Sequence, residues 1–259
     1  MSRLILNKNQ SLKFLFCLIT FHLYSANSQN HKFHLNFALG AGLNKRYDSY
    51  QSKIVYSGIS ALGLIGLSHV HEKWHNHFWA AGFGGLMHNP NLETYTLYNF
   101  GFEAQLSIKR LASSSLLKHK WFIGLGNCTT SDISYHQSFQ NNAWSWVSVS
   151  TIGIANRFEK SFQIKKEAFS WEWNLHLPVY AFAITPKFSP SITSNSSFEN
   201  SWGFLGKHAI WQSTLGFSWL QKNNNRFGFS YQWRHSYTNA ANIRQDAMHQ
   251  FLLTMDVAL

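Results

Sequence analysis

The chain has 259 residues, enough for one membrane barrel or for one or two ordinary domains. Charged residues make up only 13% of it, whereas about a quarter is usual in a soluble domain. A hydrophobic content of 45% and a mean hydropathy of −0.21 are too low for a helical membrane protein. The net charge of +11 comes from basic residues scattered through expected turns and loops, so no nucleic-acid-binding patch is predicted.

The N-terminus has the pattern of a secretory signal. Three basic residues precede an apolar run at 14–23, and small residues follow this run as far as Ser28. The run is shorter than the roughly 20 apolar residues that a spanning helix needs. We therefore predict a signal peptide at residues 1–28 and a mature chain at 29–259.

The two cysteines predict no internal disulfide. Cys17 lies within the expected signal and would be removed with it, which leaves Cys128 alone in the mature chain. We expect Cys128 to be an inert thiol in a loop.

Residues that alternate between apolar and polar predict strands along the first half of the mature chain, because successive side chains on a strand point to opposite faces. The clearest segment is apolar at even positions from Tyr98 to Ile108 and polar at odd positions between them. The expected strands are 33–42, 53–70, 75–87 and 98–109, separated by 44–52, 71–74 and 89–91. In the third strand, Trp79, Ala81 and Phe83 are expected to face lipid.

The second half repeats the pattern. Its clearest segment is 169–179, where an aromatic and aliphatic face that includes Trp171 and Trp173 alternates with a polar one. The expected strands are 120–126, 143–156, 169–179, 208–219, 227–234 and 249–259. The expected turns are 113–115, 159–166 and 223–225, and the expected long polar loops are 127–142, 185–207 and 237–246.

These elements predict an all-β fold: a single antiparallel up-and-down transmembrane β-barrel of about ten strands. Most segments reach the roughly 9–11 residues that a tilted membrane strand needs. Hydrocarbon offers no hydrogen-bond partners to an open sheet edge, so the sheet must close on itself. The long loops follow odd-numbered strands and the tight turns follow even-numbered ones, as in barrels with short periplasmic turns and longer extracellular loops.

The mature chain resembles the Gram-negative outer-membrane β-barrel proteins. The resemblance is one of pattern over nearly the whole mature chain, and no family-specific motif carries it. The final segment, Phe251 to Leu259, resembles the C-terminal signal that the barrel-assembly machinery reads, although such proteins typically end in an aromatic residue. The resemblance implies location in the cell outer membrane, contact with outer-membrane lipids and lipopolysaccharide, and assembly through the last strand.

Polar residues on the inward faces are the first candidates for a site, because a narrow barrel has little room for bulk water and its charges should pair. The expected polar network comprises Glu103, Gln105, Lys109, Glu172, Asn174, His176, Gln232 and Arg234. Arg234 is expected to point inward and to pair with Glu103, Glu172 or both. Such a network is either a path for protons or ions or a plug that stiffens the barrel, and the plug is favoured because the architecture requires a polar lumen.

Three residues at the expected outer rim are weak candidates for catalysis: His235, Ser236 and His208, with Asp246 nearby. Outer-membrane phospholipases and lipid A deacylases use a Ser–His pair on the barrel wall, and omptin proteases use carboxylates with a histidine at the rim. A nucleophile needs its base within hydrogen-bond reach. Among fourteen histidines, some Ser–His neighbours are expected by chance.

Metals and cofactors are not predicted. His69 with His71, or His75 with His77, share a strand face, but no cysteine or carboxylate cluster completes either pair. The sequence has no phosphate-binding glycine loop or dinucleotide motif. We therefore expect a non-enzymatic surface barrel with a largely plugged lumen, structural or ligand-binding through its external loops, with an unidentified ligand. The alternatives are a small pore and a lipid hydrolase that uses the rim Ser–His pair.

Overall fold

The computed structural model describes residues 32–49, 52–71, 73–89, 92–114, 119–136, 144–186, 198–204, 206–240 and 242–259. The predicted signal peptide, residues 1–28, lies outside them. The strands are β1 (Lys32–Asp48), β2 (Ser52–Val70), β3 (Trp74–Asn89), β4 (Leu92–Ser114), β5 (His119–His136), β6 (Trp144–Ile164), β7 (Glu167–Pro186), β8 (Phe198–Phe204), β9 (His208–Leu220), β10 (Arg226–Asn239) and β11 (Ile243–Ala258). None of the described residues belongs to a helix that is long and apolar enough to cross a membrane.

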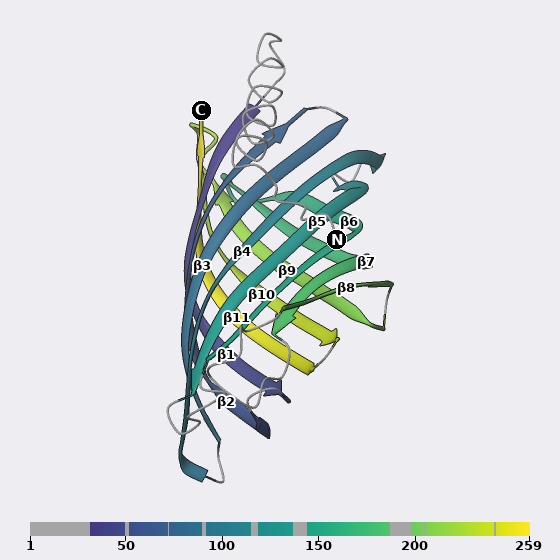
Figure 1. Ribbon diagram of the computed structural model, residues 1–259. Coiled ribbons are helices and arrows are strands. Elements are labelled where there is room, and N and C mark those ends of the chain that lie inside the picture. The colour runs from purple at the N-terminus through teal and green to yellow at the C-terminus, as the bar shows by residue number, and fades with distance from the viewer. Residues whose placement is uncertain are drawn as a thin grey trace.

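The strands form a closed antiparallel barrel (Figure 1). β1 pairs with β2 on one side and with β11 on the other, so the first and last strands meet along a seam from His34↔Ala258 to Asp48↔Arg244. β8 and β9 both pair with β7, one after the other, and occupy a single position in the barrel. The eleven strands therefore fill ten positions, which confirms the predicted ten-stranded up-and-down barrel.

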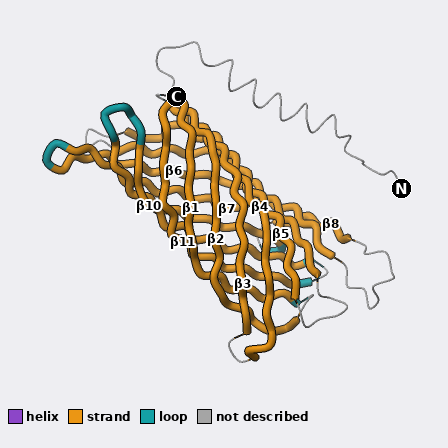
Figure 2. The backbone as a smooth tube through the Cα atoms, turned by 90° about the vertical axis from the view of Figure 1, so that its left-hand side faces the viewer, coloured by secondary structure: helices purple, strands orange, loops and turns teal. Residues whose placement is uncertain are grey.

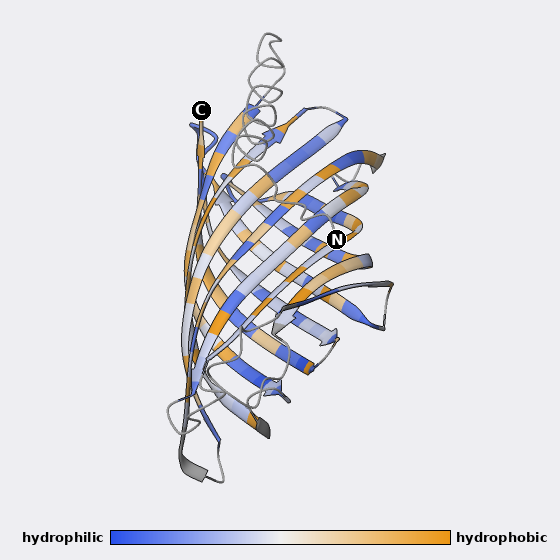
Figure 3. Ribbon diagram, in the orientation of Figure 1, coloured by the Kyte–Doolittle hydropathy of each residue, from blue (hydrophilic) through white to orange (hydrophobic). Residues whose placement is uncertain are grey.

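The outer wall is apolar because alternate residues point away from the barrel interior. Leu39, Phe100, Phe251 and Leu253 have 60–74% of their surface exposed on it, whereas their chain neighbours point inward. Figure 3 shows the resulting alternation of hydrophobic and hydrophilic residues along the strands. Exposed aromatic and aliphatic side chains in such numbers would be unfavourable in water and are expected where the wall meets lipid.

The two ends of the barrel differ in their connections. We call the end that holds the start of β1 and the end of β11 the terminal end, and the other the distal end (Figure 1). At the terminal end β6 and β7 are joined by residues 165–166 alone, with Lys165 at φ 56°. At the distal end the longest connections are 137–143 and 187–197.

Most of the strands are longer than predicted, up to 23 residues in β4 (Figure 2). They absorb much of what we expected to be loop: 44–48, 127–136, 237–239, 243–246 and the predicted turn at 159–164 are strand. The predicted loop 185–207 contains β8. Most of these corrections have a common cause: the strands continue beyond the length that a bilayer requires, and polar residues on the continuation resemble a loop in sequence.

The distal part of β5 was missed for a second reason, which is that its polarity, like that of the adjacent part of β6, is reversed. Val147 and Val149 point inward and pack with Cys128, whereas Asn127 and Thr129 point outward and hydrogen-bond to Ser150. The side chain of Cys128 is fully buried in the lumen. The prediction of an inert thiol in a loop was therefore wrong about its position.

The expected lipid-facing side of β3 was also wrong. Trp79, Ala81 and Phe83 point inward and form an apolar cluster with Leu62 and Leu252 of other strands. Small residues, including Gly82 and Gly84, lie on the outward face between them. We expected the bulkier residues to face lipid, but at this level they fill the interior of the barrel instead.

Candidate functional site in the barrel lumen

An ion pair between Glu103 and Arg234 crosses the middle of the lumen. Glu103 lies on β4 and Arg234 on β10, which are five strand positions apart in either direction around the ten-position barrel. The two side chains therefore meet across the full width of the interior, and both are buried. The ring of Phe83 lies 5.0 Å from the Arg234 guanidinium, as in a cation–π contact.

Gly101 makes room for this arrangement. A Cβ atom at this position would collide with the ring of Phe83 and with the Cβ of Asp132. The glycine thus permits Phe83 to lie beside the arginine in the middle of the barrel.

A denser network closes the distal half, and we call its charged members the distal cluster: Arg46, Asp48, Asp132, Arg244 and Asp246. Arg46 donates to Asp132 at 3.3 Å and also contacts Asp246. Arg244 donates to Asp246 at 2.9 Å, contacts Asp132, and has an Nη1 atom 3.8 Å from Asp48.

The distal cluster ties together strands that are not neighbours. Arg46 on β1 and Asp132 on β5 are separated by β2, β3 and β4 in the sheet, so their contact crosses the interior. Asn99 and Ser145 extend the network: Asn99 accepts from Arg46 at 3.1 Å, and Ser145 donates to Asp48 at 3.2 Å. All five charged side chains are 12% exposed or less. Charges buried to this degree are tolerated where each is paired and hydrogen-bonded.

The terminal half has its own ion pairs, which span fewer strand positions than the longest contacts of the distal cluster. Arg157 on β6 donates to Glu172 on β7 at 2.6 Å and to Glu159 at 3.3 Å. Arg226 on β10 contacts Glu159 at 3.3 Å. Glu172 is 27% exposed, so this group of charges is less desolvated than the distal cluster.

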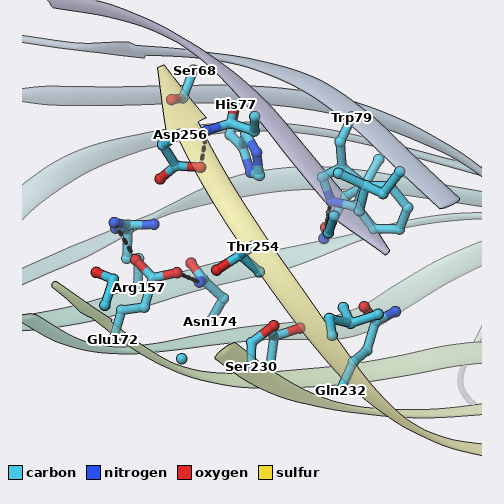
Figure 4. A pocket seen from close by; sticks show the side chains of 18 of the residues that line it. Ser68, His77, Trp79, Arg157, Glu172, Asn174, Ser230, Gln232, Thr254 and Asp256 are labelled. Atoms are coloured by element: carbon cyan, nitrogen blue, oxygen red, sulfur yellow. Dashed lines mark hydrogen bonds and ion pairs between the residues drawn. The ribbon is translucent and has the colours of Figure 1, made fainter. Parts of the chain in front are cut away.

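A cavity of about 130 Å³ occupies the terminal half beside these pairs (Figure 4). Polar side chains from strands all round the barrel line it. They include Lys109, His75, Arg157, His176 and Gln232, together with the carboxylates of Glu172 and Asp256.

The structure places all eight residues of the expected polar network on the inward side of the wall, in two groups. Glu103 and Arg234 contact each other, whereas Glu172 contacts Arg157 and not Arg234. The Glu103–Arg234 contact was an expected alternative, and the Glu172–Arg234 contact is not formed. The other members have these neighbours: Gln105 accepts from Trp79 Nε1 at 2.8 Å, Asn174 donates to Glu172 at 3.5 Å, His176 Nε2 lies 3.1 Å from Thr151 Oγ1, and Lys109 and Gln232 line the cavity.

The three weak catalytic candidates are not brought together. His235 and Ser236 are consecutive on β10 and therefore point to opposite sides of the wall. The His235 ring lies outside, 5.4 Å from the ring of Trp211, whereas Ser236 is buried inside. His208 is buried inside on β9, and neither of its ring nitrogens has a hydrogen-bond partner among the described residues. Asp246 is held by Arg46 and Arg244.

The distal cluster was not predicted from the sequence, because its residues lie in segments that we expected to be loops. A signal was nevertheless present. Arg46 and Asp48 continue the even-numbered inward face of the first strand, and Arg244 and Asp246 continue that of the last. Extending the alternation through polar residues would have placed both pairs in the lumen.

The histidine pairs do not form a metal site. Within the described ranges, no group of three histidine, cysteine, aspartate or glutamate residues is arranged to hold a metal ion. His75 and His77 both point inward with ring centroids 6.0 Å apart, and His69 stacks on Phe33 outside at 4.4 Å.

Comparisons with known proteins identify the fold but no family. No family model matches the sequence, and no curated protein matches it. Among solved structures, the outer-membrane protease OmpT from Escherichia coli matches with a TM-score of 0.53 and 7% identity, over 90% of this chain and 98% of that one. The translocator domain of the autotransporter NalP from Neisseria meningitidis matches with a TM-score of 0.34 and 8% identity, over 95% of each chain.

The closed barrel, its apolar outer wall and its polar interior together define the class. The chain is an integral β-barrel of the Gram-negative outer-membrane type. Its location is the outer membrane.

Proposed function

We propose that the protein is a closed, non-conducting barrel that acts as a structural or surface ligand-binding protein through its distal end. The observation that carries this proposal is the distal cluster. Two arginines and three aspartates cross the lumen there, and the Glu103–Arg234 pair and the apolar cluster around Phe83 fill the next level. An ion would have to break several buried pairs to pass.

Conductance in planar lipid bilayers tests this proposal. The wild-type protein is expected to give no steady conductance steps. Replacing both arginines of the cluster, as Arg46→Ala with Arg244→Ala, should give channel openings, provided that the variant still folds as judged by heat-modifiable migration on a gel. Lys45→Ala, on the outward side of the same strand, should stay silent. Stable conductance steps in the wild type would favour the small-pore alternative and contradict the proposal.

The acidic groups of the distal cluster do not favour the activity of the protease with a similar fold. A protease of the omptin kind needs acidic groups that are free to act on water or on a peptide at the rim. Here Asp132 and Asp246 each contact two arginines, and Asp48 lies near Arg244. The hydrolase alternative is likewise weakened, because His235 and Ser236 lie on opposite sides of the wall.

The proposal includes two kinds of partner. Outer-membrane lipids and lipopolysaccharide would contact the apolar outer wall, and the barrel-assembly machinery would bind the C-terminal strand β11, whose outward face carries exposed Phe251 and Leu253. The short connections at the terminal end support placing that end in the periplasm. An epitope inserted between residues 187 and 197 should then be labelled by antibody on intact cells, whereas one inserted at Asn224 should be labelled only after the outer membrane is permeabilised.

A further inference from the structure

The cavity in the terminal half is lined by one cation, Lys109, that makes no ion pair with a described carboxylate, although Glu172 and Asp256 line the same cavity. Arg157 contacts Glu159 and Glu172, and Arg226 contacts Glu159. In contrast, no carboxylate of the described residues lies within 4.0 Å of the Lys109 ammonium, although Lys109 is only 3% exposed. An ammonium group removed from water without a counter-charge is unfavourable, so an anion beside it would be stabilising.

The wall next to Lys109 is shaped to leave space. Strand pairing places His75, Lys109, Gly124, Ala155 and His176 in one row across β3 to β7. At about 4.8 Å between neighbouring strands, Lys109 and His176 are about 14 Å apart along the row, with only a glycine and an alanine between them. Of the two small residues, Ala155 lines the cavity and forms its floor, and the ring of His176 lies close to it.

Residues that line the cavity hold buried hydrogen-bond donors without a partner, and Asn36 and Asn174 hold buried acceptors of the same kind. Arg157 pairs with Phe122, which lies two residues from Gly124 on β5. The Nε atom of Arg157 is buried and has no hydrogen-bond partner among the described residues, and the same is true of the Nε2 atom of Gln232. Both residues line the cavity, and both atoms can only donate. Buried polar atoms without protein partners indicate a bound molecule or ordered water.

We infer that this cavity is a binding site for a small oxyanion, a phosphate or a carboxylate, which lies beside Ala155 with Lys109 as its charged ligand. An oxyanion supplies a negative charge in contact with Lys109 and several acceptors for the unused donors. The site lies in the lumen and does not depend on whether the distal half conducts.

Binding is tested on the folded protein in detergent micelles by isothermal titration with inorganic phosphate and, separately, with acetate. Sodium chloride at equal ionic strength serves as the blank. Saturable binding of at least one of the two anions is expected, and the relative affinities show whether the site prefers the tetrahedral or the planar ion. Lys109→Met should weaken binding at least tenfold, and Lys109→Arg should retain most of it.

Two controls keep the test decisive. Lys160→Met removes the same charge from an exposed position on β6 and should leave binding unchanged. Ala155→Val keeps Lys109 but raises the floor, and should also weaken binding. Heat-modifiable migration verifies that each variant is folded. No saturable binding to the wild type, or equal losses in Lys109→Met and Lys160→Met, would show that the cavity holds only water and would overturn the inference.

Discussion

The two halves of the lumen use the same kinds of side chain but differ in how the charges are arranged. In the distal half, two arginines and three aspartates contact one another across the interior. In the terminal half, Arg157 pairs with Glu172 on the neighbouring strand, Arg226 reaches Glu159 three strand positions away, and a cavity remains beside Lys109. In the distal half, the contact between Arg244 on β11 and Asp132 on β5 spans five strand positions. Pairs that span the full width of a barrel fill it, whereas pairs of shorter span leave part of the centre open. The two halves therefore differ in how far their ion pairs reach across the barrel.

The largest effect is expected from Arg244→Met, which removes one of the two cations of the distal cluster. It would leave Asp48, Asp132 and Asp246 buried with Arg46 alone, and breaking a buried pair typically costs about 3–5 kcal/mol. The free energy of unfolding, measured by urea titration in lipid vesicles, should fall by that amount. Lys45→Met, on the outward face of β1, should change it by less than about 0.5 kcal/mol. Equal effects of the two variants would show that the distal cluster does not stabilise the barrel.

A smaller effect is expected from the coupling between Glu103 and Arg234. The single variants Arg234→Met and Glu103→Gln each leave a buried partner without its counter-charge, whereas the double variant removes both charges. The loss in the double variant should therefore be smaller than the sum of the two single losses, by about 0.5–3 kcal/mol. Unfolding titrations of the three variants and the wild type give this coupling directly. Additive losses would mean that the two side chains do not interact in the membrane.

Arg157→Gln tests the terminal half and should be milder. Its partner Glu172 is 27% exposed and adjoins a cavity with room for water, so a stranded carboxylate can be hydrated. A loss of about 1 kcal/mol in the free energy of unfolding is expected, and it should shrink as salt is raised. A loss as large as that of Arg244→Met, independent of salt, would contradict the distinction between the two halves.

The smallest effect is expected from His235→Ala. The side chain lies outside the lumen against Trp211 and takes no part in either half. Stability should change by less than about 0.5 kcal/mol. Any release of fatty acid from phospholipid vesicles should be the same for the wild type and the variant. Hydrolysis that disappears in the variant would revive the enzyme alternative.

The sequence predicted the barrel, its ten strand positions and its inward polar faces wherever apolar and polar residues alternate strictly, as from Tyr98 to Lys109. It failed where that contrast is weak or reversed. In β5 and β6, Val149 points inward and Thr129 outward, so the lipid-facing rule gives the wrong answer. In β3 the same rule misplaced Trp79.

The contacts within the lumen were harder to predict than its residues. The alternation predicts that Arg234 points inward. It does not predict which carboxylate Arg234 contacts, because that depends on the width of the barrel and the tilt of the strands. Glu103 and Glu172 both point inward, and only Glu103 lies diametrically opposite. To predict the distal cluster, one would also have had to recognise Arg46 and Asp246 as strand residues.

The Glu103–Arg234 pair also has a consequence for the order of folding. Its residues are 131 positions apart, whereas Arg157 and Glu172 are 15 apart within one hairpin. The hairpin pair can form as soon as β6 and β7 meet, but the diametric pair requires that the strands between β4 and β10 be in place on at least one side. Contacts of such long sequence separation form late because the chain entropy must be lost first. Loss of Arg234 should therefore accelerate the opening of the finished barrel and leave the rate of its initial insertion nearly unchanged.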